Sequence, residues 1–236
     1  MQGELFLIPA PLGEEAIKPF SQYLIDQIHQ LDVFIVERGK TARQFLKKIK
    51  TPIPLQNMTF FELNKRTDPA DHLSFLQPAI KGNKNIGLLS EAGCPGVADP
   101  GAIIVKLAHE LGIKVTPMVG PSSILLALMS SGMNGQQFAF HGYLPIKSNE
   151  RKKALKNLER ESALKNQTQI FIETPYRNDG LVDDTLLTLQ PNTLFGIAVD
   201  LTLDSEWTHT KTIKSWRKTA IPKLHKRPTV FLLLAE

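Results

Sequence analysis

Four turns rich in glycine and proline are the parts of this chain best suited to hold a small molecule. Each follows a run of apolar residues and precedes a stretch with helical spacing; they are Pro9–Glu14, Ser90–Gly101, Val119–Ser123 and Glu173–Arg177. In open α/β sheets, ligands bind beyond the carboxyl ends of the strands, where helix N-termini offer free N–H groups to negative charge. The four turns are therefore candidates for lining one cleft, although any single turn of this kind is more often only a turn.

Familiar nucleotide and metal fingerprints are missing. Gly93, Gly96 and Gly101 follow neither the G-x-G-x-x-G spacing of dinucleotide sites nor the G-x-x-x-x-G-K of phosphate-binding loops, so an ordinary NAD or ATP enzyme has no support. Cys94 is the only cysteine, which excludes an internal disulfide and a zinc site built on paired cysteines. The six histidines are too widely spaced for a metal cluster, and we expect no metal.

The elements that would position these turns alternate between short strands and helices. In the first half, apolar runs such as Ile86–Leu89 separate stretches with three- and four-residue apolar spacing, such as Pro19–Gln30. This alternation predicts an α/β domain with crossover helices. The pattern loosens from Gln136 to Pro145. We place a boundary there, giving an N-terminal α/β domain at 1–135 and a C-terminal α/β domain at 136–236.

The composition is that of a folded protein with no membrane span. Hydrophobic residues make up 42% and charged residues 22% of the 236 residues, which excludes wholesale disorder. The longest apolar runs reach only six residues, against roughly 20 for a membrane-spanning helix. The N-terminus also lacks the basic start and apolar run of a signal peptide. Together with the single cysteine, these features predict a soluble cytoplasmic protein without a membrane partner.

The whole chain has a net charge of +5, and its excess of basic residues lies in the second half. The segment Lys211–Arg227 carries seven basic residues and no acidic one, and Lys147–Lys165 carries seven basic against three acidic. A single run of this kind is usually a solvated face. With two runs in one domain, a polyanionic partner is about as plausible as two solvated faces. Trp216, inside the first run, could then stack on an unpaired base.

Five segments carry, in order, a resemblance to a known family; they are LFLIPAPLGE, LLSEAGCPGVADPG, VGPSSILLALMSSG, FHGYLPIK and FIETPYR. The chain resembles the tetrapyrrole methylase superfamily of S-adenosylmethionine-dependent methyltransferases. Within it, the chain is most similar to the branch that methylates a cytidine 2′-hydroxyl of small-subunit ribosomal RNA. The resemblance implies a two-domain α/β fold, a homodimer, ribosomal RNA or a ribosomal subunit as partner, and S-adenosylmethionine bound in the cleft between the domains.

The resemblance also implies which residues contact the methyl donor; they are Leu12, Ala92, Gly93, Cys94, Val97, Ser122, Ser123 and Glu173. Small residues at 92–94 would let backbone groups reach the donor, and Ser122 at a helix start could meet its carboxylate. Cys94 is expected to be a small loop residue rather than a nucleophile, because no histidine lies near it in the sequence.

Methyl transfer to a hydroxyl needs donor and acceptor held in line, and a group that takes the hydroxyl proton. Glu37 ends the predicted strand Val33–Val36. It matches the acidic proton acceptor of the sirohaem branch of the family that the chain resembles. The resemblance therefore makes Glu37 the candidate catalytic residue. An equally good interpretation is that Glu37 is only a solvated residue at the end of a strand.

Two segments depart from the RNA-methylating branch and leave the acceptor open. Where that branch reads EDTRHTR, the segment Glu37–Arg43 lacks the aspartate and the histidine, and Val199–Trp207 lacks an arginine, a lysine and a histidine. The chain could therefore be a divergent paralogue. The leading hypothesis is an RNA methyltransferase; the alternatives are a methylase of a tetrapyrrole or other small metabolite, and a donor-binding protein without catalysis.

Overall fold

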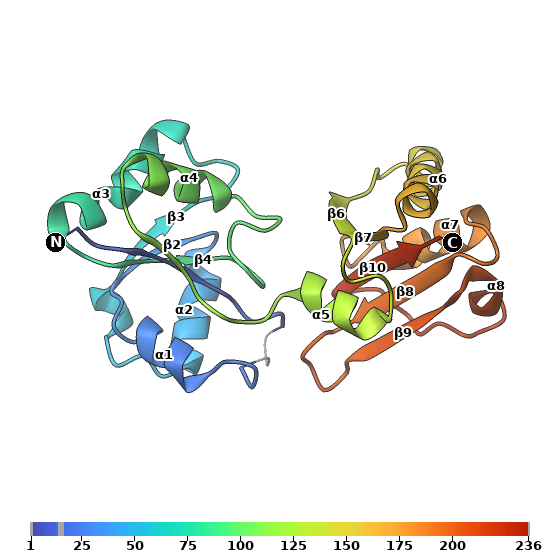
Figure 1. Ribbon diagram of the computed structural model, residues 1–236. Helices are drawn as coiled ribbons and strands as arrows, with labels where there is room; N and C mark the ends of the chain where they lie inside the picture. Colours follow the sequence, from blue (N-terminus) through green and yellow to red (C-terminus); the bar gives the residue numbers. More distant parts are fainter. Residues whose placement is uncertain (1, 14–16, 236) are drawn as a thin grey trace. The chain divides into compact units, whose positions relative to one another are not determined.

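The computed structural model describes residues 2–13 and 17–235, so Glu14, the last residue of the first predicted turn, lies outside the described residues. The chain divides into two compact units, Met1–Ser122 and Ser123–Glu236 (Figure 1). This division precedes the boundary expected between residues 135 and 136. The reason is that helix α5 (Ser123–Ser131) contacts strands β8, β9 and β10 of the second unit.

The first unit is built on a five-stranded parallel sheet. Its strands are β1 (Leu5–Ile8), β2 (Val33–Val36), β3 (Thr59–Glu62), β4 (Ile86–Leu89) and β5 (Val115–Pro117). They lie in the order β3-β2-β4-β1-β5, and every neighbouring pair is parallel. The carboxyl ends of all five strands therefore lie along one edge of the sheet.

Helices cover both faces of this sheet. One face carries α1 (Gln22–Ile28) and α2 (Gly39–Lys48), and the other carries α3 (His72–Gly82) and α4 (Ala102–Glu110). In β2, Phe34 and Val36 belong to the core beneath α1 and α2, whereas Val33 and Ile35 belong to the core beneath α3 and α4. Side chains alternate along a strand, so a central strand buried on both faces is apolar throughout. Short 3-10 turns occupy Leu55–Asn57 and Pro69–Asp71.

The second unit is built on a mixed five-stranded sheet. Its strands are β6 (Phe138–Tyr143), β7 (Thr168–Ile172), β8 (Leu194–Val199), β9 (Trp207–Thr212) and β10 (Thr229–Leu234). The order is β6-β7-β10-β8-β9; β6 and β7 are parallel and the other pairs are antiparallel. The stacked rings of Phe171, Phe195 and Phe231 form the centre of its core. Its remaining helices are α6 (Ser148–Lys165), α7 (Asn178–Thr188) and α8 (Ile213–Trp216).

The α/β class expected from the sequence is confirmed, while several elements differ in extent. The helix expected at 19–30 begins only at Gln22, because the Ser21 side chain caps it by accepting a hydrogen bond from the N–H of Leu24 at 3.2 Å. The helical stretch expected after the turn Val119–Ser123 begins at Ser123, the last residue of that turn. Strands β3, β6 and β9 and helix α8 were not expected from the apolar pattern. Of the helices described, none has the length and apolar character needed to span a membrane.

Candidate active site

Three of the four predicted turns meet at the carboxyl edge of the first sheet. The turns after β1 and β4 are joined by two backbone hydrogen bonds: Ala10 N–H donates to the Gly93 carbonyl at 2.8 Å, and Gly93 N–H donates to the Ala10 carbonyl at 3.0 Å. The turn after β5 joins them, since the Cys94 thiol donates to the Pro121 carbonyl at 3.6 Å. The first unit therefore gathers its three predicted turns at one place.

Gly93 lies at the centre of this junction. Its backbone φ is +71°, a conformation that favours glycine. A Cβ at this position would lie 3.4 Å from Cδ2 of Leu12 and 3.8 Å from the carbonyl oxygen of Pro121. A longer side chain would therefore push into the space between the first and third turns. In general, a position without a side chain lets another group approach the backbone closely.

The long turn after β4 is held in shape by Asp99, a residue that the sequence analysis missed. Its Oδ1 accepts hydrogen bonds from the N–H of Gly96 at 2.7 Å and of Gly101 at 2.8 Å. The Ser90 hydroxyl adds a hydrogen bond to the Gly93 carbonyl at 3.0 Å. Aspartate side chains often bond to backbone N–H groups in turns, so the D-P-G triplet in the sequence was the available signal.

Cys94, Val97 and Ser122 also lie on these turns. Burial raises the pKa of the Cys94 thiol, although a hydrogen bond with Ser122 acts in the opposite direction. A thiol with a raised pKa is mostly protonated at neutral pH and is a poor nucleophile, in keeping with the structural role expected of Cys94. Val97 is 46% exposed, and Ser122 is half-buried.

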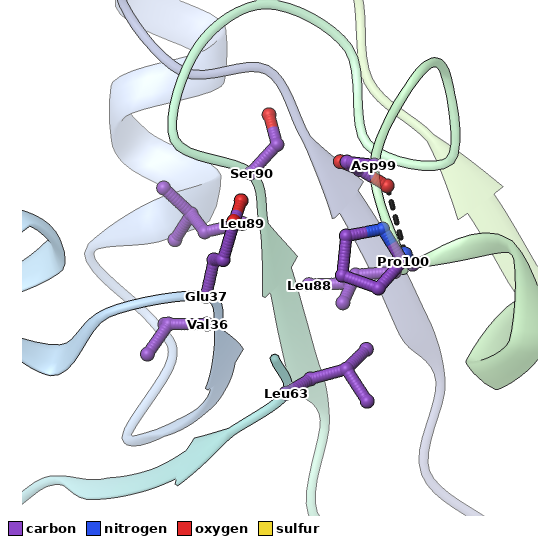
Figure 2. A pocket seen from close by; sticks show the side chains of 9 residues that line it. Val36, Glu37, Leu63, Leu88, Leu89, Ser90, Asp99 and Pro100 are labelled. Carbon is purple, nitrogen blue, oxygen red and sulfur yellow. Dashed lines mark hydrogen bonds between the residues drawn. The ribbon is translucent and has the colours of Figure 1, made fainter. Parts of the chain in front are cut away.

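Glu37 directly follows β2 and lines a narrow pocket, which has room for about one water molecule. Figure 2 shows Glu37 at the end of its strand, beside Ser90 and across from Asp99. Leu63 and Leu88 are among the apolar residues that line it. The carboxylate therefore lies against apolar surface at the same edge of the sheet as the three turns.

This environment raises the pKa of Glu37. Burial has the largest effect, the negative charges of Glu91 and Asp99 add to it, and the positive charges of Arg38 and Lys65 oppose it. The pKa of Asp99 is raised as well, chiefly by burial, against its two backbone hydrogen bonds. A carboxylate with a raised pKa accepts a proton more readily, which is what a general base requires.

A larger hollow of about 740 Å³ opens beside the first two turns, a volume within the range of ligand pockets. Leu12 and Ala92 line it from the turns, while Gln44 and Lys47 line it from α2. Helix α2 is tied to the second turn, because the Thr41 hydroxyl donates to Oε2 of Glu91 at 3.2 Å. Within the described ranges, no group of three or more His, Cys, Asp or Glu side chains is arranged to hold a metal ion.

The other two predicted donor contacts, Ser123 and Glu173, belong to the second unit. Ser123 is the first residue of α5, and Glu173 follows β7 with its side chain fully buried. Oε1 of Glu173 accepts hydrogen bonds from the Thr174 N–H and from Arg177, both at 2.6 Å. Among the described residues, Oε2 has no hydrogen-bond partner. A buried carboxylate oxygen without a partner is costly, so Glu173 retains an acceptor for a further donor group.

The role expected of Trp216 is wrong. Its side chain is 1% exposed, and its Nε1 donates to the carbonyl of Phe195 at 2.7 Å. The ring belongs to the core of the second unit and cannot stack on a nucleotide base. Short helix α8 follows edge strand β9 and turns the ring inward, while the neighbouring lysines stay at the surface.

No family model matches the chain, but individual proteins are similar to it. The Ribosomal RNA small subunit methyltransferase I of Haemophilus influenzae is 28% identical over 238 residues, which cover 100% of this chain and 79% of that protein. The protein of the same name from Bacillus subtilis is 33% identical over 175 residues, which cover 74% of this chain and 56% of that protein.

Solved structures show the same architecture. The methyltransferase CobJ superposes with a TM-score of 0.62 at 15% identity, over 99% of this chain and 94% of that chain. The uroporphyrin-III-C-methyltransferase from Thermus thermophilus gives a TM-score of 0.57 at 16% identity, over 99% and 93%. The chain belongs to the tetrapyrrole methylase superfamily. The resemblance drawn from five sequence motifs is thereby confirmed, and the chain is a methyltransferase by family.

Proposed function

We propose that this tetrapyrrole methylase family member transfers a methyl group from S-adenosylmethionine to a ribose 2′-hydroxyl of small-subunit ribosomal RNA. The observation that carries the proposal is the similarity to the Haemophilus influenzae protein, which extends over 100% of this chain. That relative is named as a ribosomal RNA small subunit methyltransferase. An enzyme with this substrate works where ribosomes are assembled, so we propose a cytoplasmic location.

The turns around Gly93 support binding of the methyl donor. The space beside Gly93 is bounded by Leu12 and Pro121, and a side chain at position 93 would fill it. When bound, S-adenosylmethionine supplies a methyl group on a positively charged sulfur. The residues that we propose to hold it are Leu12, Ala92, Gly93, Cys94, Val97, Ser122, Ser123 and Glu173.

Glu37 is the proposed general base. Burial against apolar side chains raises its pKa, and proton transfer is most effective when the pKa of the base approaches the working pH. In the proposed reaction, the hydroxyl proton would move to the Glu37 carboxylate as the hydroxyl oxygen bonds to the methyl carbon. The bond from that carbon to the donor sulfur would break at the same time, and its electron pair would leave the sulfur as a neutral thioether. Asp99 supports this role by contributing negative charge near Glu37 and by shaping the adjoining turn.

A small-molecule acceptor is the second candidate. The segment Glu37–Arg43 departs from the RNA-methylating pattern, and the chain shares its fold with a uroporphyrin-III-C-methyltransferase. A donor-binding protein without catalysis is the third. These candidates differ in which acceptor receives label, so one assay separates them.

The deciding experiment incubates the purified protein and labelled S-adenosylmethionine with small ribosomal subunits from cells that lack this chain. We expect label in the RNA, and we expect it at linkages that resist alkaline hydrolysis, because a methylated 2′-oxygen cannot attack the neighbouring phosphate. Label in an added uroporphyrinogen instead would favour the second candidate. Donor binding without transfer to either acceptor would favour the third.

A matched pair of glycine variants tests the donor site. Gly93→Leu should reduce donor binding below detection in calorimetry, because the side chain fills the proposed site. Gly112→Leu is the control, since Gly112 has nearly the same φ of +70° but nothing within 4 Å of its Cβ position. Both variants carry similar backbone strain. Equal donor affinity in the two variants would place the donor elsewhere.

We also propose that the protein is a homodimer, as the family resemblance implies. Helix α5 supports the proposal: Ala127 and Leu128 are buried, while Met129 is 78% exposed on the same apolar helix. Exposed apolar side chains next to a buried face are common at subunit contacts. Sedimentation at micromolar concentration tests it, and a stable monomer would contradict it.

A further inference from the structure

Helix α2 carries an unbalanced positive charge that the sequence analysis did not single out. The segment 38–61 contains six basic residues and no acidic one. Three of them, Lys40, Arg43 and Lys47, lie at spacings of three and four residues and share one face of the helix. We call these three residues the α2 stripe.

The α2 stripe faces away from the protein core. Ala42, Phe45 and Leu46 are buried on the opposite side of the helix, whereas all three stripe residues are exposed. Arg43 rests over the Phe60 ring, with its guanidinium carbon 4.4 Å from the ring centroid. This cation–π contact orients the guanidinium while leaving it accessible.

Few negative charges offset the α2 stripe. Among residues 2–13 and 17–235, no carboxylate forms an ion pair within 4.0 Å of Lys40, Arg43 or Lys47. The Glu62 carboxylate lies near the start of the helix, but its Oε1 accepts a hydrogen bond from the Gly39 N–H at 2.8 Å. The stripe therefore keeps a net positive charge at the surface.

The α2 stripe adjoins the candidate active site. Lys47 lines the 740 Å³ hollow together with Leu12 and Ala92. The hydrogen bond from Thr41 to Glu91 fixes α2 against the turn that contains the predicted donor contacts. A polyanion bound along the stripe would therefore pass directly beside the hollow.

We propose that the α2 stripe binds phosphates of the acceptor RNA and guides the strand to the active site. This inference rests on the proposed function, because it needs an RNA acceptor. Lys40, Arg43 and Lys47 would each neutralise a backbone phosphate and release a condensed counterion. RNA is the favoured partner because it is a continuous polyanion. It matches three cations that lie along one helix face beside the candidate active site and that form no ion pair with a described residue.

The test uses a variant with all three stripe residues replaced, K40Q/R43Q/K47Q, and measures its affinity for a small-subunit ribosomal RNA fragment across a salt series. Each lost contact with a single strand removes about 0.7 from the slope of log K against log salt. Three lost contacts should flatten the slope by about 2 and weaken binding by about 100-fold at 0.1 M salt.

Helix α6 offers a matched control. Lys153, Lys156 and Arg160 have the same composition and the same spacing as the α2 stripe, and all three are exposed. The variant K153Q/K156Q/R160Q should change RNA affinity by less than threefold. A double variant, K40Q/R43Q, spares Lys47 and therefore leaves the lining of the hollow intact; it should lose about 20-fold in affinity by the same arithmetic.

The outcomes separate this inference from the proposed function. If the wild type methylates ribosomal subunits, yet the α2 and α6 variants bind RNA equally well, the α2 stripe is not the RNA surface and the proposed function stands. If the wild type neither binds nor methylates RNA at low salt, both are overturned. Binding to anionic vesicles that K40Q/R43Q abolishes, without any effect of that variant on RNA affinity, would assign the stripe to a membrane surface instead.

Discussion

Helix α2 and the segment Lys211–Arg227 are both rich in basic residues, but the two regions use their charges differently. In the second region, Arg217 donates hydrogen bonds to the carbonyls of Leu186 and Leu189, and Arg227 pairs with Asp200 at 2.8 Å. Among the described residues, the α2 stripe forms no such hydrogen bond or ion pair. A dense run of basic residues can therefore serve the fold in one unit and stay available to a ligand in the other.

The largest expected effect is on the rate of methyl transfer at the candidate active site beside α2. Replacing Glu37 with Gln should lower the rate of methyl transfer by about 10²- to 10⁴-fold, the usual contribution of a general base. Donor affinity and RNA affinity should change little, because neither is proposed to depend on this proton acceptor. Single-turnover kinetics with labelled donor measure the rate; a variant with the wild-type rate would remove Glu37 from the mechanism.

The variant Glu37→Gln is also expected to change the stability of the protein, in a direction that follows from the raised pKa of Glu37. The folded state raises the pKa of Glu37 above its ordinary value of 4.5, so the folded protein binds this proton more tightly than the unfolded chain. Stability is therefore lost as the pH rises from 4.5 through the raised pKa. Because Gln cannot ionise, Glu37→Gln should be more stable than the wild type at neutral pH and should lose this part of the pH dependence in urea denaturation.

The next largest expected effect is a loss of stability when Trp216, in the segment Lys211–Arg227, is replaced. Trp216→Ala should destabilise the protein by about 3–5 kcal/mol, the usual range for removing a buried large aromatic side chain. Trp216→Phe keeps most of the volume but leaves the Phe195 carbonyl without its donor, which costs about 1–3 kcal/mol. Urea denaturation measures both. A Trp216→Phe variant with normal stability but reduced RNA affinity would restore the base-stacking role.

The smallest effect separates two neighbours in the basic run. Arg217 bonds the carbonyl of Leu186, near the C-terminal end of α7, at 2.7 Å, so Arg217→Gln should cost about 1 kcal/mol in stability. Exposed Lys214 has no ion pair among the described residues, and Lys214→Gln should stay within about 0.5 kcal/mol of the wild type. Equal effects would show that the run is a uniform solvated surface.

The strands of the first unit could largely be predicted, because central strands of a parallel sheet are buried on both faces. Val33–Val36 and Ile86–Leu89 are four apolar residues each, and both appear as strands at the expected positions. Edge strands lack this signature. Strand β9, Trp207–Thr212, contains mostly polar residues and pairs on one side with β8 alone, so it could not be separated from the basic run.

The meeting of three turns also followed from the sequence, since parallel strands place their carboxyl ends at one edge. The residues that shape the turns did not. Asp99 acts through hydrogen bonds to Gly96 and Gly101, and Trp216 is buried by packing against strands that come earlier in the chain. Both roles depend on three-dimensional neighbours, and local residue type gives only a weak indication of them.

The two hydrogen bonds of Asp99 are stronger to the carboxylate than to the acid, since they lower its pKa, but they do not require the carboxylate to stay ionised. Both backbone N–H groups bind the same atom, Oδ1, so a proton on Oδ2 would remove neither bond. Asp99→Asn should keep the turn for the same reason, since an amide oxygen can occupy the Oδ1 position. The turn can thus keep both hydrogen bonds, in weaker form, when Asp99 is protonated. A fall in methyl transfer at low pH that persists in Asp99→Asn would report protonation of Glu37 and not of Asp99.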